Sequence, residues 1–266
     1  LGVYTSRIFD AAQNGLPLST AEAWAGSLCF TFQVYFDFSG YTDIAIGAAL
    51  LIGLRLPENF RSPYRATGFI EFWRRWHISL GSWFRDYIYI PLGGSRCSKW
   101  KSFRNTMIIF LVSGLWHGAN WTFICWGAFH ALLFLPLLLM GRNRKYKDIV
   151  AENKYLPSLK ELGQIISTFI LVMIGWVIFR AENIKEAYQY IIYMFTKWQP
   201  SSLEYGVKCI QYIAILIIIE WINRRKMHGL EINIKYPIIR WGIYCAIFYY
   251  VFYYSNDIQT FIYFQF

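Results

Sequence analysis

The chain has 266 residues, of which 56% are hydrophobic and 20% aromatic, while only 16% are charged. Soluble domains average about 25% charged residues, and the apolar residues here form blocks long enough to cross a bilayer, which takes about 20 residues of helix. This composition argues against a soluble domain and predicts an all-α, polytopic membrane protein. The net charge of +10 gathers between the apolar blocks, which is typical of cytoplasmic loops and argues against nucleic-acid binding.

Six segments are apolar on all faces and are predicted to lie in the membrane, within a single domain spanning residues 1–266. They cover residues 26–53, 105–119, 121–140, 162–179, 207–223 and 237–254. The loops with basic clusters are expected on the cytoplasmic side; these are 54–104, 141–160 and 224–240. The chain begins with a polar stretch at Leu1, so we expect the natural N-terminus to be missing.

Residues 69–87 differ from these segments because they are amphipathic. Apolar side chains recur there at i, i+3, i+4 and i+7, with charged residues on the opposite side. This spacing predicts one helix that lies in the interface or re-enters the protein instead of spanning the membrane. The segments 105–119 and 121–140 together predict a hairpin with His117 at its bend.

Two carboxylates, Asp37 and Asp43, fall inside the first apolar segment. A charge at that depth is costly unless it is paired or hydrated. Either residue could line a polar path through the membrane, or one of them could pair with an arginine for structural reasons. The sequence leaves both interpretations open.

The chain has four histidines, and histidine is the natural base near neutral pH. His117 lies between Gly114 and Gly118, which leave room for backbone or ligand to approach closely. A structural histidine in an apolar helix is the alternative. His77 falls at the edge of the amphipathic stripe, where it could face an internal cavity or lipid headgroups. His130 is expected to be a structural hydrogen-bonder and His228 a solvated loop residue.

Arginines in the basic loops could bind the phosphates of a nucleotide-like donor, or anionic lipid headgroups; they are Arg61, Arg65, Arg74, Arg75 and Arg85. The sequence contains no motif typical of a serine hydrolase, an ATP-driven pump or a metalloprotease. The five cysteines show no metal-ligand spacing. We therefore predict neither a metal site nor a bound cofactor.

Six ordered motifs resemble one known family over nearly the whole chain. They are YFDFSGYTD at 35–43, LPENFRSPY at 56–64, FWRRWHISL at 72–80, FRDYIYIPLGG at 84–94, SGLWHGANW at 113–121 and FIYFQF at 261–266. The set resembles the membrane-bound O-acyltransferase (MBOAT) family, in the bacterial branch of the alginate O-acetyltransferase membrane subunit. The D-alanyl transfer protein of teichoic acid modification is a more distant relative.

This resemblance implies a fold and a chemistry that the residue spacing does not show. The fold is a ring of helices around a tunnel through a thinned membrane, and family members begin with several further spans that this chain lacks. The near-invariant histidine of the family matches His117, and a second polar residue matches His77, so both are expected to be catalytic. Residues expected to bind substrate are Arg74, Arg75, Trp76, Asp37, Trp116 and Asn120.

The expected activity is transfer of an acyl group to hydroxyls of an exported polysaccharide. The expected acyl group is acetyl, and the expected donor is a cytoplasmic thioester such as acetyl-CoA. Transfer would be direct or through periplasmic or extracellular acetyltransferase partner proteins. The protein would be a multi-pass protein of the bacterial cytoplasmic (inner) membrane, surrounded by lipid. The alternative function is a non-catalytic transporter or scaffold of a polysaccharide export complex, for which buried carboxylates would also be suitable.

Overall fold

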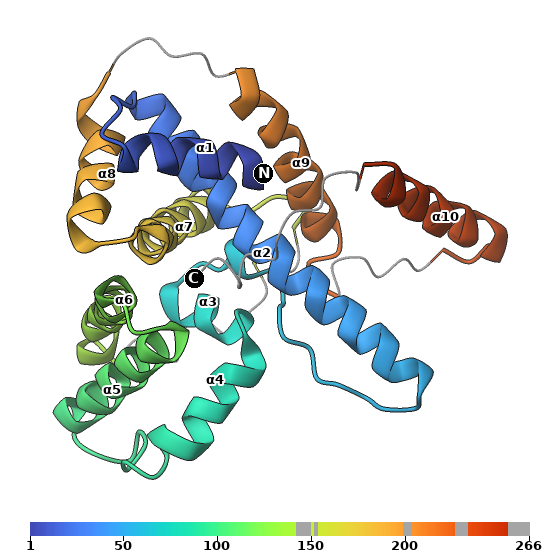
Figure 1. Ribbon diagram of the computed structural model, residues 1–266. Helices are drawn as coiled ribbons and strands as arrows, with labels where there is room; N and C mark the ends of the chain where they lie inside the picture. The colour runs from blue at the N-terminus through green and yellow to red at the C-terminus, as the bar shows by residue number, and fades with distance from the viewer. Residues whose placement is uncertain (142–149, 152–153, 199–203, 227–233, 255–266) are drawn as a thin grey trace.

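The computed structural model describes residues 1–141, 150–151, 154–198, 204–226 and 234–254, and its regular structure there is entirely helical (Figure 1). In chain order the α-helices are α1 Gly2–Gln13, α2 Thr20–Leu51, α3 Phe69–Arg75, α4 Ile78–Phe84, α5 Lys99–His117, α6 Trp121–Leu139, α7 Leu159–Arg180, α8 Ile184–Thr196, α9 Glu204–Ile222 and α10 Pro237–Tyr254. A 3₁₀ turn, η1 Pro63–Arg65, precedes α3, and a π-helical turn, η2 Arg85–Tyr89, follows α4.

The long helices α2 and α7 begin before their apolar stretches because polar caps extend them. The Ser19 hydroxyl accepts a hydrogen bond from the Glu22 amide at 3.2 Å, and the Glu22 carboxylate accepts one from the Ser19 amide at 3.0 Å. Ser158 and Glu161 form the same capping box at α7. Such a box satisfies backbone donors that a helix start leaves free. The helix expected over 26–53 therefore starts at Thr20.

The core begins where α1, α2, α7 and α8 meet (Figure 1) and continues through buried residues of α3, α6 and α9. Several hydrogen bonds fasten α2 to α8 within it. The Thr20 hydroxyl donates to the Tyr193 carbonyl at 2.9 Å, the Trp24 indole to the Met194 carbonyl at 2.7 Å, and the Tyr190 hydroxyl to the Ala23 carbonyl at 3.0 Å. Buried donors that find partners in this way stabilise the packing of the two helices.

α5 and α6 form an antiparallel hairpin whose backbones touch. A Cβ atom on Gly114 would lie 2.3 Å from the Phe123 carbonyl oxygen, and one on Gly127 would lie 2.2 Å from the Phe110 carbonyl oxygen. Only glycine permits this approach, because any other residue would place a carbon inside the neighbouring backbone. The hairpin therefore fixes the end of α5, which is His117.

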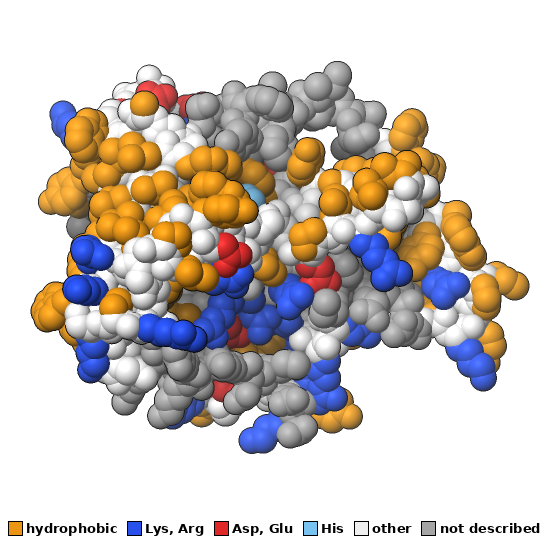
Figure 2. Space-filling model, turned by 90° about the horizontal axis from the view of Figure 1, so that it is seen from below, with side chains coloured by type: hydrophobic (Ala, Val, Ile, Leu, Met, Phe, Trp, Pro, Cys, Tyr) orange, Lys and Arg blue, Asp and Glu red, His pale blue; other side chains and the backbone are white. Residues whose placement is uncertain are grey.

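Two of the described helices, α6 and α7, are long and apolar enough to cross a membrane by length and composition. Residues Cys209–Ile222 of α9 form a shorter apolar stretch. On the face shown in Figure 2, apolar side chains cover a broad area that Lys and Arg side chains border on one side. Such a border is typical of a membrane–water interface. The membrane crossings of the other predicted segments stay predictions.

The single helix expected over 69–87 is wrong, because the structure breaks it into α3 and α4. The break falls at Trp76, which is extended, and His77, which is left-handed with φ 45°. Backbone hydrogen bonds to the preceding loop replace helical ones: the Arg61 amide donates to the Arg75 carbonyl at 3.0 Å, and the Ile78 amide to the Asn59 carbonyl at 2.9 Å. Periodicity missed the break because both pieces continue the same apolar stripe.

Candidate functional site

His77 lies at the junction of α3 and α4 in a strained conformation. A left-handed backbone costs a non-glycine residue roughly 1–2 kcal/mol, and such strain collects at functional sites. Its ring packs beside Phe60 and Phe38, with centroids 5.9 and 6.4 Å away. Burial lowers the pKa of His77 below its usual value of 6.5. Its Nδ1 atom is buried without a hydrogen-bond partner among the described residues.

His117 ends α5, and side chains of α6 and α7 hold its ring in place. The Trp126 ring of α6 meets it edge-on at 5.4 Å between centroids, and the Phe179 ring of α7 does so at 4.9 Å. Gly118 follows with φ 154°, and a Cβ atom there would lie 2.8 Å from the Phe123 ring. The space beside these glycines is therefore filled by α6, and His117 lies on the wall of a cavity together with Trp126 and Phe179.

His77 and His117 line the same cavity, which has a volume of about 260 Å³. Residues from α2, α3, α4, α5, α6 and α7 complete its wall, with Ser113 one turn before His117. The Trp116 ring contacts both histidines, at 6.4 Å from the His77 centroid and 4.9 Å from that of His117. The structure thus brings together the two residues that the sequence predicted to be catalytic.

A second, larger cavity of about 540 Å³ adjoins the first. The two cavities share wall residues, among them Trp76, His77 and Ser113. The second cavity adds two exposed arginines, Arg74 and Arg85, to its wall. A long molecule with an anionic end could therefore lie in the larger cavity with its other end beside the histidines.

The wall of the smaller cavity carries donors whose hydrogen bonds the described residues do not satisfy. The indole Nε1 atoms of Trp73, Trp126 and Trp176 are buried without a partner among the described residues. His77 Nδ1 is also unpaired, and it is a donor in only one tautomer of the neutral ring. The backbone amide of Gly118, by contrast, donates to the Leu115 carbonyl at 3.2 Å. Unpaired buried donors cost about 1–3 kcal/mol each, so a ligand oxygen that accepted a hydrogen bond from one of these indoles would offset that cost. Sequence reasoning missed Trp73 and Trp126 individually, because an apolar helix holds many aromatics.

The predicted substrate-binding residues are only partly gathered here. Arg74 lines the larger cavity and Trp76 lines both. Asp37, half-buried on α2, and Trp116 line neither of these two cavities. Asn120 caps α6 instead: its side chain accepts a hydrogen bond from the Thr122 amide at 3.1 Å and donates to the Glu182 carbonyl at 2.7 Å.

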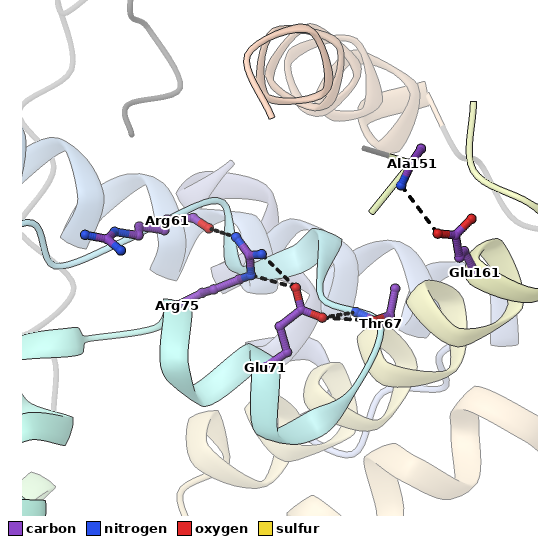
Figure 3. A network of polar contacts seen from close by, with 6 residues as sticks. All are labelled: Arg61, Thr67, Glu71, Arg75, Ala151 and Glu161. Carbon is purple, nitrogen blue, oxygen red and sulfur yellow. Dashed lines mark hydrogen bonds and ion pairs between the residues drawn. The ribbon is translucent and has the colours of Figure 1, made fainter. Parts of the chain in front are cut away.

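Arg75, the remaining candidate, lies in a separate polar network (Figure 3). Its guanidinium pairs with Glu71 at 2.7 Å and donates to the Arg61 carbonyl at 3.2 Å. The Glu71 carboxylate also accepts from the amide and hydroxyl of Thr67, both at 2.9 Å. The network joins α3 to the loop before it, so the visible contacts of Arg75 are structural.

The other two histidines lie apart from this arrangement. His130 is fully buried, but neither ring nitrogen has a hydrogen-bond partner among the described residues. The expectation of a structural hydrogen-bonder is therefore wrong; the ring packs between aromatic rings, stacked on Phe69 at 5.2 Å and edge-on to Trp73 at 5.0 Å. His228 and the motif at 261–266 lie outside the described residues. Across the described part of the chain, no group of three metal-ligating side chains occurs.

Comparison with known proteins gives matches over most of the chain. A family profile described as MBOAT, membrane-bound O-acyltransferase family, matches residues 6–179. The chain is 42% identical over 225 residues to a Pseudomonas aeruginosa protein named probable alginate O-acetylase AlgI, which covers 82% of this chain and 41% of that protein. It is 42% identical over 179 residues to a Helicobacter pylori peptidoglycan O-acetyltransferase, covering 67% of this chain and 32% of the relative.

A Bacillus subtilis teichoic acid D-alanyltransferase is 33% identical over 182 residues, covering 63% of this chain and 44% of that protein. The chain thus spans about two fifths of the length of these curated relatives, or less. The matched range 6–179 includes both histidines of the smaller cavity.

Proposed function

The chain belongs to the membrane-bound O-acyltransferase family, and from this premise we propose that it transfers an acetyl group from a cytoplasmic thioester to hydroxyls of an exported polysaccharide. The observation that carries the proposal is the placement of His77 and His117 on the wall of one cavity. Acyl transfer to a hydroxyl needs a base beside the reacting atoms. His117 can be that base, and His77 is a second polar ring on the wall of the same cavity.

His117 acts as the general base in this proposal. It takes the proton from the acceptor hydroxyl while the hydroxyl oxygen attacks the thioester carbonyl carbon. The carbon–sulfur bond then breaks, and the departing thiolate takes the proton from His117. A positioned base of this kind contributes about 10²–10⁴-fold in rate. His77 orients the acyl donor or the hydroxyl from the opposite wall, where its strained backbone holds the ring.

The acyl donor enters through the larger cavity. Acetyl-CoA, a substrate and not a bound cofactor, has phosphates that Arg74 and Arg85 could bind. Its thioester end would then reach the wall residues that the two cavities share. The larger cavity is the donor path, and the smaller one is where the acceptor meets the acyl group.

The acceptor is a cell-envelope polysaccharide. Relatives are named for alginate, peptidoglycan and teichoic acid, which are all polymers found outside the cytoplasmic membrane. We place the protein in that membrane as a multi-pass protein whose helices surround a tunnel, with α3 and α4 re-entering it. Transfer is direct or passes through a periplasmic or extracellular acetyltransferase partner.

Acetyl transfer by the purified full-length protein tests this function. Consumption of acetyl-CoA would be followed with a short polysaccharide acceptor, for the unaltered protein and for His117→Ala. We expect acceptor-dependent consumption that His117→Ala abolishes, with a thermal unfolding curve showing that the variant still folds. Saturable polymer transport without thioester consumption would instead support a conduit or scaffold.

A further inference from the structure

Trp126 lines the cavity beside His117 and carries an indole N–H that the described residues do not satisfy. Its side chain is only 1% exposed, its Nε1 atom has no partner among the described residues, and its ring lies 5.4 Å from that of His117 at 87°. We propose that the Trp126 indole N–H donates to the oxyanion that forms on the acyl carbonyl during transfer. This inference rests on the proposed acyltransferase function.

The chemistry of the other donors leaves this role to an indole. The Gly118 amide already donates to the Leu115 carbonyl, so it is engaged by the end of α5. A neutral imidazole has one N–H, which sits on either nitrogen and is lost or gained with pH. An indole N–H is a donor only and does not titrate near neutral pH. The Trp126 ring is also in direct contact with the ring of the proposed base. The other two unpaired indoles, Trp73 and Trp176, contact the Trp126 ring.

Oxyanion stabilisation works when the donor is fixed before the charge forms, and the surroundings of Trp126 fix it. The ring packs edge-on against Trp73 at 5.7 Å and against His130 at 4.9 Å, and it stacks on Trp176 at 5.9 Å. Contacts on several sides leave the indole no room to change rotamer. His130 contributes to this packing, because its ring contacts the indoles of both Trp73 and Trp126.

The step balances without any further reactant. The acceptor oxygen forms a bond to the carbonyl carbon as its proton passes to His117, and the carbonyl oxygen becomes an oxyanion that accepts the Trp126 N–H. The carbonyl then reforms as the carbon–sulfur bond breaks, and the thiolate takes the proton from His117. The indole N–H bond is neither made nor broken. Its hydrogen bond strengthens as negative charge develops on the carbonyl oxygen, so it stabilises the transition state more than the ground state.

Trp126→Phe in the full-length protein tests the inference, because it removes the N–H and keeps an aromatic ring. Loss of one oxyanion donor lowers kcat by about 10²–10³-fold, and we expect such a fall with KM changed by less than about threefold. Trp24→Phe is the matched control, since it deletes an indole N–H that donates to the Met194 carbonyl away from the cavity. Its kcat should stay within about twofold of the unaltered protein.

His117→Ala in the same assay separates the two proposals. Wild-type kcat in Trp126→Phe beside an inactive His117→Ala would overturn the oxyanion role alone, and full activity in both would overturn the oxyanion role and His117 as the base. No acceptor-dependent acetyl transfer by the unaltered protein would overturn the proposed function. A raised KM at unchanged kcat would also overturn the role, because it would place the N–H in ground-state binding. If Trp126→Phe does not fold, position 126 can instead carry 3-benzothienylalanine, which keeps the shape of the indole but has sulfur in place of the N–H. The kcat of that protein then decides whether the N–H is needed.

Discussion

Replacing Gly114 with alanine perturbs the packing that holds His117 in place. The new Cβ atom would lie 2.3 Å from the carbonyl oxygen and 2.9 Å from the carbonyl carbon of Phe123. Both are backbone atoms, so no side-chain rotation relieves the clash. The contact must open by about 0.7 Å or more before it reaches the shortest distances that real Cβ atoms show, and overpacking of this kind costs about 1–3 kcal/mol.

The displacement acts on catalysis because Gly114 lies one helical turn before His117 on α5. A misplacement of about 1 Å in a reacting group can lower the rate by about 10²-fold. We expect Gly114→Ala to unfold at a lower temperature and to lose at least about tenfold in kcat.

The measurements are thermal unfolding in detergent and acetyl transfer by the full-length protein. Gly163→Ala is the matched control, because a Cβ there meets nothing within 4 Å. Its exposed site on α7 should gain up to about 1 kcal/mol from helix propensity. If Gly114→Ala matched Gly163→Ala in both stability and kcat, the close contact between α5 and α6 would not position His117.

Three further outcomes follow from the site. His77→Gly and His77→Ala should both lose most of the transfer activity. The glycine variant should be more stable than the alanine variant by about 1 kcal/mol, because glycine adopts the left-handed backbone without strain. Equal unfolding temperatures for the two variants would show that the backbone at this position is not strained. Burial lowers the pKa of His77, so its ring is uncharged at neutral pH. The transfer activity should therefore stay constant from about pH 8 to about pH 6.5 and fall only in more acid buffer. An activity that has already fallen by half at about pH 7.5 would contradict this prediction. Glu71→Gln leaves the Arg75 guanidinium without its ion pair, so the free energy of unfolding measured by chemical denaturation should fall by about 2–3 kcal/mol. An unchanged denaturation midpoint would mean that the network in Figure 3 does not stabilise the fold.

The sequence predicted the parts of this molecule that depend on short-range patterns. Apolar blocks marked the long helices, and the motifs around His77 and His117 pointed to both residues of the cavity. Neither pattern could show that Trp76 and His77 break a helix, because the backbone groups that replace the helical bonds belong to Asn59 and Arg61 in the preceding loop.

Burial and pairing were equally hidden from the sequence. Arg74 and Arg75 are neighbours with the same chemistry, yet one lines a cavity and the other pairs with Glu71. Which of the two faces the cavity depends on the tertiary fold. Trp126 lies outside the motifs that marked the site, and only the contact of its ring with His117 singles it out.

The most direct test of the account is single-turnover acetyl transfer by His117→Ala, with and without added imidazole. Because His117 is proposed as the base, its loss should slow the chemical step by about 10²-fold or more. Imidazole should restore part of the rate in proportion to its uncharged form, since the deleted ring leaves space on the cavity wall. A His117→Ala protein that transfers acetyl at the unaltered rate would contradict the assignment of His117 as the base.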